Sequence, residues 1–292
     1  VRGNVAILPG GSLILQPGVV LKMGSGLQFV NSGSLSIRGS FETPVVITSE
    51  RDDSIGGDTN GDGAATAPAP GDWRTVVMTG QAVTSFVGGL ELRYGGAIGE
   101  SFRSDSPQTV IRQLRAERSL TAGAAFTAYA GSLQRVAAFG NGGVGIDLRN
   151  GSLPVRQLTA ASNGDAGVRR ALAFGGTVSD SIAWGNAGPN FEGFAAGELR
   201  FSDGDPALAG QDGNIDTDPL FVDLLAGDLR LTDVSPCVDT GDPASPLDPD
   251  GTRADMGAYF LTVCEPEVFC AQAVFPPCAP SLSFAGFASL SS

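Results

Sequence analysis

The stretch Val136-Ala-Ala-Phe-Gly-Asn-Gly-Gly-Val-Gly-Ile146 is echoed 22 residues later by Leu158-Thr-Ala-Ala-Ser-Asn-Gly-Asp-Ala-Gly-Val168. Leu114 precedes Val136 by the same interval, and Leu92 precedes Leu114 by that interval again. A further copy begins slightly late, at Ile182. The interval is too short for a repeated pair of helices and is typical of one coil of a β-solenoid.

The repeat carries an asparagine at one fixed place, at Asn141 and Asn163, with Asn186 in the late copy. In a solenoid, strands of successive coils stack about 4.8 Å apart and alternate side chains point into a narrow core. Asparagine tolerates left-handed turns, and its amide can bond copies of itself in adjacent coils. We therefore expect a structural asparagine ladder at one corner.

Short apolar segments separated by Pro-Gly or Gly-Ser turns fill the first third of the chain, at 13–15, 19–21, 27–29, 35–37 and 45–47. The 42 glycines and 18 prolines are too many for a helical protein, and 42% hydrophobic residues are too many for a disordered chain. A β-sandwich would not explain the repeat interval. We predict an all-β, right-handed parallel β-helix of about 22 residues per coil, with nine or ten coils.

The composition also limits the function. A net charge of −13 and a pI near 4.3 disfavour binding to nucleic acid and to anionic lipid. Histidine, the commonest general base, is absent. No run approaches the roughly 18 apolar residues of a membrane helix, and the chain starts at Val1 without a signal peptide, so we interpret it as a mature or trimmed product.

Several motifs resemble those of bacterial exported right-handed parallel β-helix repeat proteins. In the N-terminal part these are Pro17-Gly-Val-Val-Leu-Lys22, Thr48-Ser-Glu-Arg-Asp-Asp53, Gly57-Asp-Thr-Asn-Gly-Asp-Gly63 and Pro70-Gly-Asp-Trp73, and in the C-terminal part Asn214-Ile-Asp-Thr-Asp-Pro-Leu-Phe221, Ser235-Pro-Cys-Val-Asp239 and Asp255-Met-Gly-Ala-Tyr259. The family motif usually closes with glutamate where this chain has Phe260. The resemblance implies a solenoid fold and a secreted or cell-surface location, and it implies no single activity because the family is functionally mixed.

The strongest local motif is Asp58-Thr-Asn60-Gly-Asp62-Gly63, in which oxygen-bearing side chains occur at every second position. Oxygen donors favour a hard cation, and the glycines permit a tight turn. The motif is similar to half of an EF-hand loop, although Ala69 stands where the bidentate glutamate would be. Asp72, or one of Glu50, Asp52 and Asp53, could supply the missing carboxylate. We predict Ca2+ binding here; the alternative is a solvated set of Asx turns.

Calcium would order the long loop from about 51 to 71. Trp73 follows this loop and is expected to pack beneath it rather than to form a sugar-stacking platform. Two further acidic clusters are either cation sites or ordinary turn formers. They comprise Asp203, Asp205, Asp212, Asp216 and Asp218, and then Asp239, Asp242, Asp248, Asp250 and Asp255.

Parallel β-helices also carry polysaccharide lyases and hydrolases, which need a positioned lysine or arginine base or paired carboxylates. Lys22, the single lysine, lies in an early strand, and Asp147, Asp165 and Asp180 are scattered in the coils. We therefore assign no catalytic residue. A basic strip could recognise an acidic polysaccharide, but its arginines are more simply expected to pair with neighbouring acids. It would comprise Arg112, Arg115, Arg169 and Arg170.

Residues 1–200 are expected to form the coils, residues 201–260 an Asp-rich capping module and residues 261–292 a tail. Four cysteines, Cys237, Cys264, Cys270 and Cys278, suit disulfide clamping outside the cytoplasm in any of three pairings, or remain unpaired. The tail alternates polar and apolar residues at 281–284 and 288–290. It could form a last strand or add to an exposed sheet edge of another copy.

These patterns together predict a non-catalytic extracellular or cell-surface scaffold that is stabilised by Ca2+. We expect a structural or adhesive role. The expected partners are a polysaccharide and further copies of the chain, which would associate through the solenoid ends or the tail. The alternatives are a polysaccharide lyase or glycoside hydrolase, and a filament subunit assembled through its tail.

Overall fold

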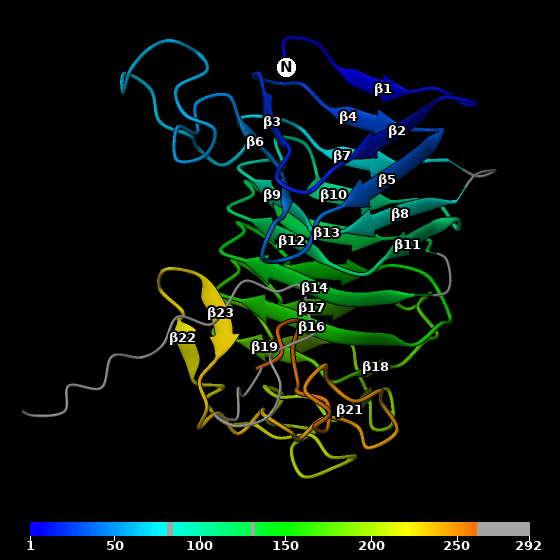
Figure 1. The fold of residues 1–292 in the computed structure, drawn as a ribbon. Coiled ribbons are helices and arrows are strands. Elements are labelled where there is room, and N and C mark those ends of the chain that lie inside the picture. The colour runs from blue at the N-terminus through cyan, green and yellow to red at the C-terminus, as the bar shows by residue number, and fades with distance from the viewer. Residues whose placement is uncertain (81–83, 130–131, 262–292) are drawn as a thin grey trace, which may run out of the picture. The chain divides into compact units, whose positions relative to one another are not determined.

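Stacked parallel strands form the body of the protein (Figure 1). The computed structural model describes residues 1–80, 84–129 and 132–261, and these residues form strands and loops without any helix. The strands make a β-solenoid of about 8 turns with about 23 residues per coil. The predicted all-β parallel solenoid is confirmed, whereas the expected nine or ten coils are too many.

The strands form three rows in two parallel sheets. One sheet takes a strand from each coil: β1 (Val5–Ile7), β4 (Phe29–Asn31), β7 (Val76–Met78), β10 (Glu100–Ser104), β13 (Ala122–Phe126), β15 (Ile146–Leu148), β17 (Val168–Arg170) and β20 (Phe191–Glu192). The larger sheet has a first row of β2 (Ser12–Leu15), β5 (Ser34–Arg38), β8 (Ser85–Gly88), β11 (Thr109–Ile111), β18 (Val178–Ser179) and β21 (Leu199–Arg200). Its second row holds β3 (Val20–Met23), β6 (Val45–Ser49), β9 (Leu90–Arg93), β12 (Leu114–Glu117) and β19 (Ile182–Trp184), while β14 (Leu133–Phe139) and β16 (Val155–Ala161) cross both rows.

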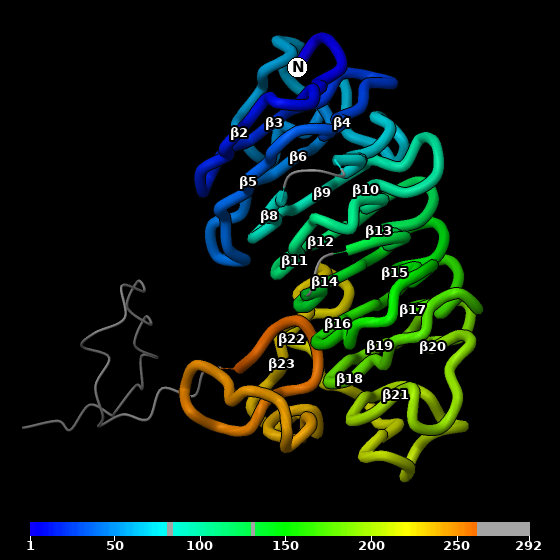
Figure 2. The backbone as a smooth tube through the Cα atoms, turned by 90° about the vertical axis from the view of Figure 1, so that its right-hand side faces the viewer, coloured from blue at the N-terminus to red at the C-terminus, as the bar shows by residue number. Residues whose placement is uncertain are grey.

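The repeat interval found in the sequence sets the register in the middle of the solenoid. Leu114 lies beside Val136, and Val136 beside Leu158, in adjacent coils. All three side chains are fully buried, so they form one continuous row in the core. Figure 2 shows the coils stacked along this part of the chain.

Leu92 departs from the expected register. It pairs with Ala116 rather than with Leu114. The reason is a longer turn: Phe102 follows Leu92 by ten positions, whereas its partner Ala124 follows Ala116 by only eight. That coil therefore spans 24 residues, which is the sequence separation between the paired residues Leu92 and Ala116.

The expected asparagine ladder is present at one corner. The Asn141 Nδ2 donates to Asn163 Oδ1 at 2.9 Å, and the Asn163 Nδ2 donates to Asn186 Oδ1 at 2.9 Å. The ladder explains the glycines four positions after Asn141 and Asn163: a Cβ at Gly145 would stand 2.6 Å from Asn163 Nδ2 and 2.7 Å from the Gly167 carbonyl. A side chain at Gly145 would therefore separate the coils.

The two rows of the larger sheet meet at a corner where single residues have the left-handed conformation. These are Arg135, Gln157 and Asp180, with φ of 56°, 58° and 52°. Such residues turn the chain by a sharp angle while the strands on either side stay paired. The corner therefore presents Arg135 and Gln157 outward, one coil above the other.

The C-terminal segment 221–261 folds back over the outside of the second row instead of continuing the solenoid. It begins with an antiparallel hairpin, β22 (Phe221–Asp223) and β23 (Asp228–Leu231), drawn in yellow in Figure 1. Leu229 and Ala258 pack against Phe139 and Ala161 on the outer face of β14 and β16. The outward side chains of these strands are therefore buried although they do not face the solenoid core.

Candidate metal centre

The loop between β6 and β7 contains the strongest sequence motif. It projects beside the first coils and appears in light blue in Figure 1. Gly56, Gly57, Gly61 and Gly63 in this loop all have φ between 70° and 78°. Few other residues adopt this conformation without strain, so these glycines allow the successive tight turns of the loop.

The turns bring three carboxylates together. Asp53, Asp58 and Asp62 can each offer one oxygen, and these oxygens lie within 4.8 Å of one another. Asp53 Oδ1 and Asp62 Oδ1 are shielded from solvent and have no hydrogen-bond partner among the described residues. Among the residues that the structure describes, this is the one group of three or more acidic, histidine or cysteine residues close enough to hold a metal ion.

Backbone amides hold Asp58 in place. Its carboxylate accepts hydrogen bonds from the amides of Gly63 at 2.8 Å and of Gly61 at 2.7 Å. These bonds, with a weaker one from Asp62, lower the pKa of Asp58 below its ordinary value. Asp58 therefore stays ionised at neutral pH, as a metal ligand must.

Asn60 lies inside the same turn and supports Asp62. Its Nδ2 donates to Asp62 Oδ2 at 3.0 Å, and the Thr66 hydroxyl donates to that oxygen at 2.5 Å. Both bonds use Asp62 Oδ2 and leave Oδ1 without a partner. The arrangement therefore keeps one Asp62 oxygen for another ligand.

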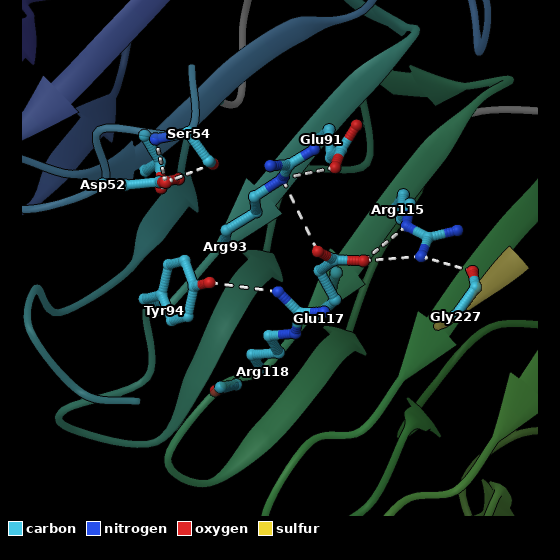
Figure 3. A network of polar contacts seen from close by, with 12 residues as sticks. Asp52, Ser54, Glu91, Arg93, Tyr94, Arg115, Glu117, Arg118 and Gly227 are labelled. Carbon is cyan, nitrogen blue, oxygen red and sulfur yellow. Dashed lines mark hydrogen bonds and ion pairs between the residues drawn. The ribbon is translucent and has the colours of Figure 1, made fainter. Parts of the chain in front are cut away.

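Asp52 and Asp72, also predicted as ligands, bond elsewhere. Asp52 is buried and accepts from Thr48 Oγ1 at 2.6 Å and from Ser54 Oγ at 2.5 Å; Figure 3 shows its bonds to Ser54. Asp72 accepts from the Ser49 hydroxyl at 2.6 Å. These two carboxylates fasten the ends of the loop to β6, and the structure does not bring them into the group of three.

Lys22 is a neighbour of the site that the sequence did not indicate. Its Nζ donates to the carbonyl of Gly57 and lies 3.9 Å from Asp53 Oδ1. Only 7% of its side chain is exposed. The sequence did offer one signal. Lys22 is the single lysine of an acidic chain, and a lysine on the outer side of a strand in such a chain is expected to meet carboxylates.

The base of the loop contains Trp73, which is fully buried and donates from its indole nitrogen to the Arg93 carbonyl at 2.8 Å. Its ring therefore packs in the hydrophobic core of the solenoid, and a sugar-stacking platform is excluded. Beside the loop, a cleft of about 530 Å³ is lined in part by Glu50, Asn60 and Asp62. Glu50 thus lies near the group of three on the cleft side.

The two C-terminal acidic clusters are largely consumed by internal hydrogen bonds. Asp203 accepts from the Thr217 amide at 2.9 Å and from the Cys237 thiol at 3.1 Å. Asp255 accepts from the Asp239 amide at 2.8 Å and from the Leu261 amide at 2.7 Å. Burial raises the pKa of Asp203 and of Asp255, because charge is costly to bury.

Cys237 is a free, buried thiol. Of the two alternatives, disulfide or unpaired thiol, the unpaired one therefore holds for this residue, whose sulfur donates to Asp203. Burial raises the pKa of the Cys237 thiol, which makes it a poor nucleophile. Cys264, Cys270, Cys278 and the tail lie outside the described residues.

The arginines of the proposed basic strip mostly pair with acids. Arg169 lies 2.7 Å from Asp147, and Arg170 lies 2.8 Å from Glu198. Burial raises the pKa of Asp147, but the bonds from Arg169 and Arg149 outweigh it, so that the pKa of Asp147 is lowered. The simpler expectation, charge pairing along the sheet, holds for these residues.

Arg115 belongs to a polar network that crosses β9 and β12 (Figure 3). Its guanidinium bonds to Glu117 at 2.5 Å, to the Tyr259 hydroxyl at 2.9 Å and to the Gly227 carbonyl at 2.8 Å. On the other side, Glu117 lies 3.5 Å from Arg93. The network therefore attaches the C-terminal segment to the middle coils.

The carboxylates weighed for catalysis lie in different places. Asp147 is on β15 between two arginines, Asp165 is exposed in a turn, and Asp180 is buried at the corner before β19. Asp180 accepts from the Ser245 hydroxyl at 2.6 Å and from the Asp242 amide at 2.5 Å. It thus anchors the C-terminal segment.

No protein-family model, no curated protein and no solved structure matches the chain. The part of the chain that the structure describes holds no helix long and apolar enough to cross a membrane.

Proposed function

We propose that this chain is an exported, non-catalytic β-helix scaffold of the extracellular space or cell surface, in which Asp53, Asp58 and Asp62 bind Ca2+. The observation that carries the calcium site is the pair of shielded oxygens, Asp53 Oδ1 and Asp62 Oδ1, that lack hydrogen-bond partners. A shielded carboxylate oxygen without a hydrogen-bond donor is costly, and a bound cation removes that cost. Lys22 Nζ, 3.9 Å from Asp53 Oδ1, is too far away to donate a hydrogen bond to it. The resemblance to exported β-helix repeat proteins supports the location.

The chemistry of the donors supports Ca2+ in particular. All three carboxylates offer oxygen, the chain has no histidine, and no cysteine of the described residues belongs to the group, so a hard cation is favoured over zinc or copper. Three negative charges next to Lys22 leave a net charge of about −2 that one Ca2+ balances. Loop carbonyls and water would complete the six to eight ligands that Ca2+ takes.

The effect of the ion would be to order the loop between β6 and β7. Extracellular calcium modules bind with a Kd of about 10⁻⁴ to 10⁻³ M. Calcium at 10 mM would then stabilise the folded protein by roughly 1.4 to 2.7 kcal/mol, which corresponds to a Tm higher by about 3–10 °C. In EDTA, a nonspecific protease should cut within residues 51–72 faster than in Ca2+.

The test uses two variants of equal charge change. Asp62→Asn, which keeps an oxygen but removes the charge, should abolish most of the Tm shift and the protection from protease. Asp233→Asn, on an exposed aspartate of the C-terminal segment, should keep both. Equal calcium shifts in the two variants, or no shift in the wild type, would show that the group does not bind Ca2+.

The non-catalytic part of the proposal has its own test. Incubation with pectin, alginate and chondroitin should yield neither unsaturated products nor new reducing ends. Product formation that a single substitution of an aspartate, lysine or arginine abolishes would replace the scaffold with a polysaccharide lyase or hydrolase.

Self-association through the tail is also part of the proposal, since the sequence of residues 281–290 alternates in the manner of a strand. Negative-stain microscopy of the full chain and of residues 1–261 should show assemblies only with the tail. Identical particles in both samples would show that the tail does not mediate self-association.

A further inference from the structure

A second, smaller pocket lies on the outside of the solenoid, far along the chain from the calcium loop. It measures about 180 Å³ and is bounded by the corner of β14 and β16 on one side and by residues 245–249 and Phe260 on the other. The volume corresponds to about six water molecules at ~30 Å³ each. It therefore has room for one small ligand, about the size of a single sugar ring.

The corner side of the pocket is lined by side chains that can donate hydrogen bonds. Gln134 lies beside Arg156 in the next coil, and by the same register Arg135 lies beside Gln157. All four are partly exposed. The corner side thus contributes two guanidinium groups and two amides from adjacent coils. It also includes Asp180, whose carboxylate already accepts from Ser245 and from the Asp242 amide.

Most of these donors have no partner in the part of the chain that the structure describes. In the described residues, the side chains of Gln134, Arg156 and Gln157 make no hydrogen bond or ion pair. Arg135 uses its Nε to bind the Ala258 carbonyl at 3.0 Å, and its guanidinium lies 4.3 Å from the centre of the Phe260 ring. These contacts hold Arg135 in place, and its terminal nitrogens have no hydrogen-bond partner among the described residues, so they remain for a ligand.

The opposite side offers acceptors and apolar surface. Asp248 uses Oδ2 to accept from the Asp255 amide at 2.8 Å, and Ser245 donates its hydroxyl to Asp180 at 2.6 Å. Asp248 Oδ1 and the lone pairs of Ser245 remain to accept from hydroxyl groups. Leu247, 65% exposed, adds an apolar wall.

We infer that this pocket binds a single sugar-acid unit, a hydroxylated ring that carries a carboxylate. A carboxylate fits a guanidinium through two parallel hydrogen bonds, which a neutral sugar cannot form with equal strength. The hydroxyl groups of the ring would donate to Asp248 and accept from the two glutamines. The net charge of −13 repels a free anion at long range, so recognition depends on the local pair Arg135 and Arg156.

This site goes beyond the scaffold function and needs no calcium. It gives the scaffold a specific ligand on the face where the C-terminal segment meets the coils. The segment forms one wall, so the pocket exists only while residues 245–249 are docked on the solenoid.

The experiment is a titration of the full chain with galacturonate and glucuronate, and with galactose and glucose as neutral counterparts, followed by saturation-transfer NMR. The sugar acids should bind saturably, and at least about tenfold more tightly than the neutral sugars. Arg156→Gln should weaken sugar-acid binding at least tenfold. Arg38→Gln, the same change at an exposed arginine on β5, should leave it unchanged.

Folding should not confuse the result, because Arg156 has no partner in the described residues whose loss would destabilise the protein. Gln134→Glu is a second test: it keeps the volume and places a negative charge beside the ligand carboxylate, so binding should again fall at least tenfold. Absence of saturable binding in the wild type, equal binding of neutral sugars, or full binding by both pocket variants would overturn the inference. The calcium-dependent Tm shift is measured separately, so either proposal can fail while the other stands.

Discussion

Replacing Asn163 by alanine tests the asparagine ladder directly. Its Oδ1 accepts from the Asn141 backbone amide at 3.2 Å and from the Asn141 Nδ2 at 2.9 Å. Its Nδ2 donates to Asn186 Oδ1 at 2.9 Å and to the Ala138 carbonyl at 3.2 Å. The side chain is therefore the central member of the ladder, and only 2% of the residue is exposed.

The expected cost follows from these four bonds. Each intramolecular hydrogen bond contributes about 0.5–1.5 kcal/mol net, and a buried amide left without an acceptor costs about 1–3 kcal/mol. The Asn141 amide would lose its acceptor, and water would enter poorly because the corner is buried. We expect Asn163→Ala to lower the free energy of unfolding by about 3–5 kcal/mol.

Urea unfolding followed by circular dichroism measures this difference, with Asn150→Ala as the matched control. Asn150 is exposed, and among the described residues its side chain only accepts from the adjacent Gly151 amide, so its loss should cost no more than about 1 kcal/mol. A double-mutant cycle between Asn141 and Asn163 should show coupling of about 1 kcal/mol or more. Equal costs for Asn163→Ala and Asn150→Ala would refute the reasoning that the ladder stabilises the stack.

Three more outcomes are expected. Burial raises the pKa of Asp248 to about 6. Its contribution to the stability of the folded protein is therefore full near pH 4 and is lost as the pH rises through 6. The free energy of unfolding of Asp248→Asn should match that of the wild type at pH 4 and exceed it by about 1–2 kcal/mol at pH 7. Arg115→Ala leaves Glu117, 5% exposed, without its closest cation. The substitution should lower the free energy of unfolding by about 3–5 kcal/mol and speed proteolysis of residues 221–261. Arg112→Ala should do neither. Leu158→Ala removes a fully buried side chain and should cost about 2–5 kcal/mol in urea unfolding, and a cost below 1 kcal/mol would contradict its place in the core.

The repeat predicted the fold because each coil imposes the same local demands. Leu114, Val136 and Leu158 recur at 22 because each fills the same core position, and Asn141 and Asn163 recur because each bonds the next copy. The number of coils was less predictable, since insertions change the length of a coil without changing its core. Leu92 was misplaced for this reason: two extra turn residues follow it, and turn length leaves no trace in the apolar pattern.

The candidate metal site was predictable in part. The alternation of Asp58, Asn60 and Asp62 indicated a turn that gathers oxygens, and the structure does gather Asp58 and Asp62. Which acid from outside the motif joins them depends on the path of the loop. Asp53 and Asp52 are neighbours in sequence, yet one faces the group and the other bonds Thr48.

The pocket at the corner could not be read from the sequence at all. Gln134 and Arg156 are unremarkable strand residues until β14 and β16 stack, and their opposite wall comes from residues about 100 positions later in the chain. No local pattern records that Ser245 returns to Asp180. Contacts of this kind depend on where the chain reverses after its last coil.

The return of the C-terminal segment also bears on how the molecule comes apart. A plain solenoid can fray from either end, since each coil touches only its neighbours. Here residues 227 and 259 bind Arg115 on β12, and residues 242 and 245 bind Asp180 near β19. The C-terminal segment therefore acts as a strap that crosses several coils. Pulling on the chain should therefore release this strap first, and the coils beneath it should then unfold together in a single large step.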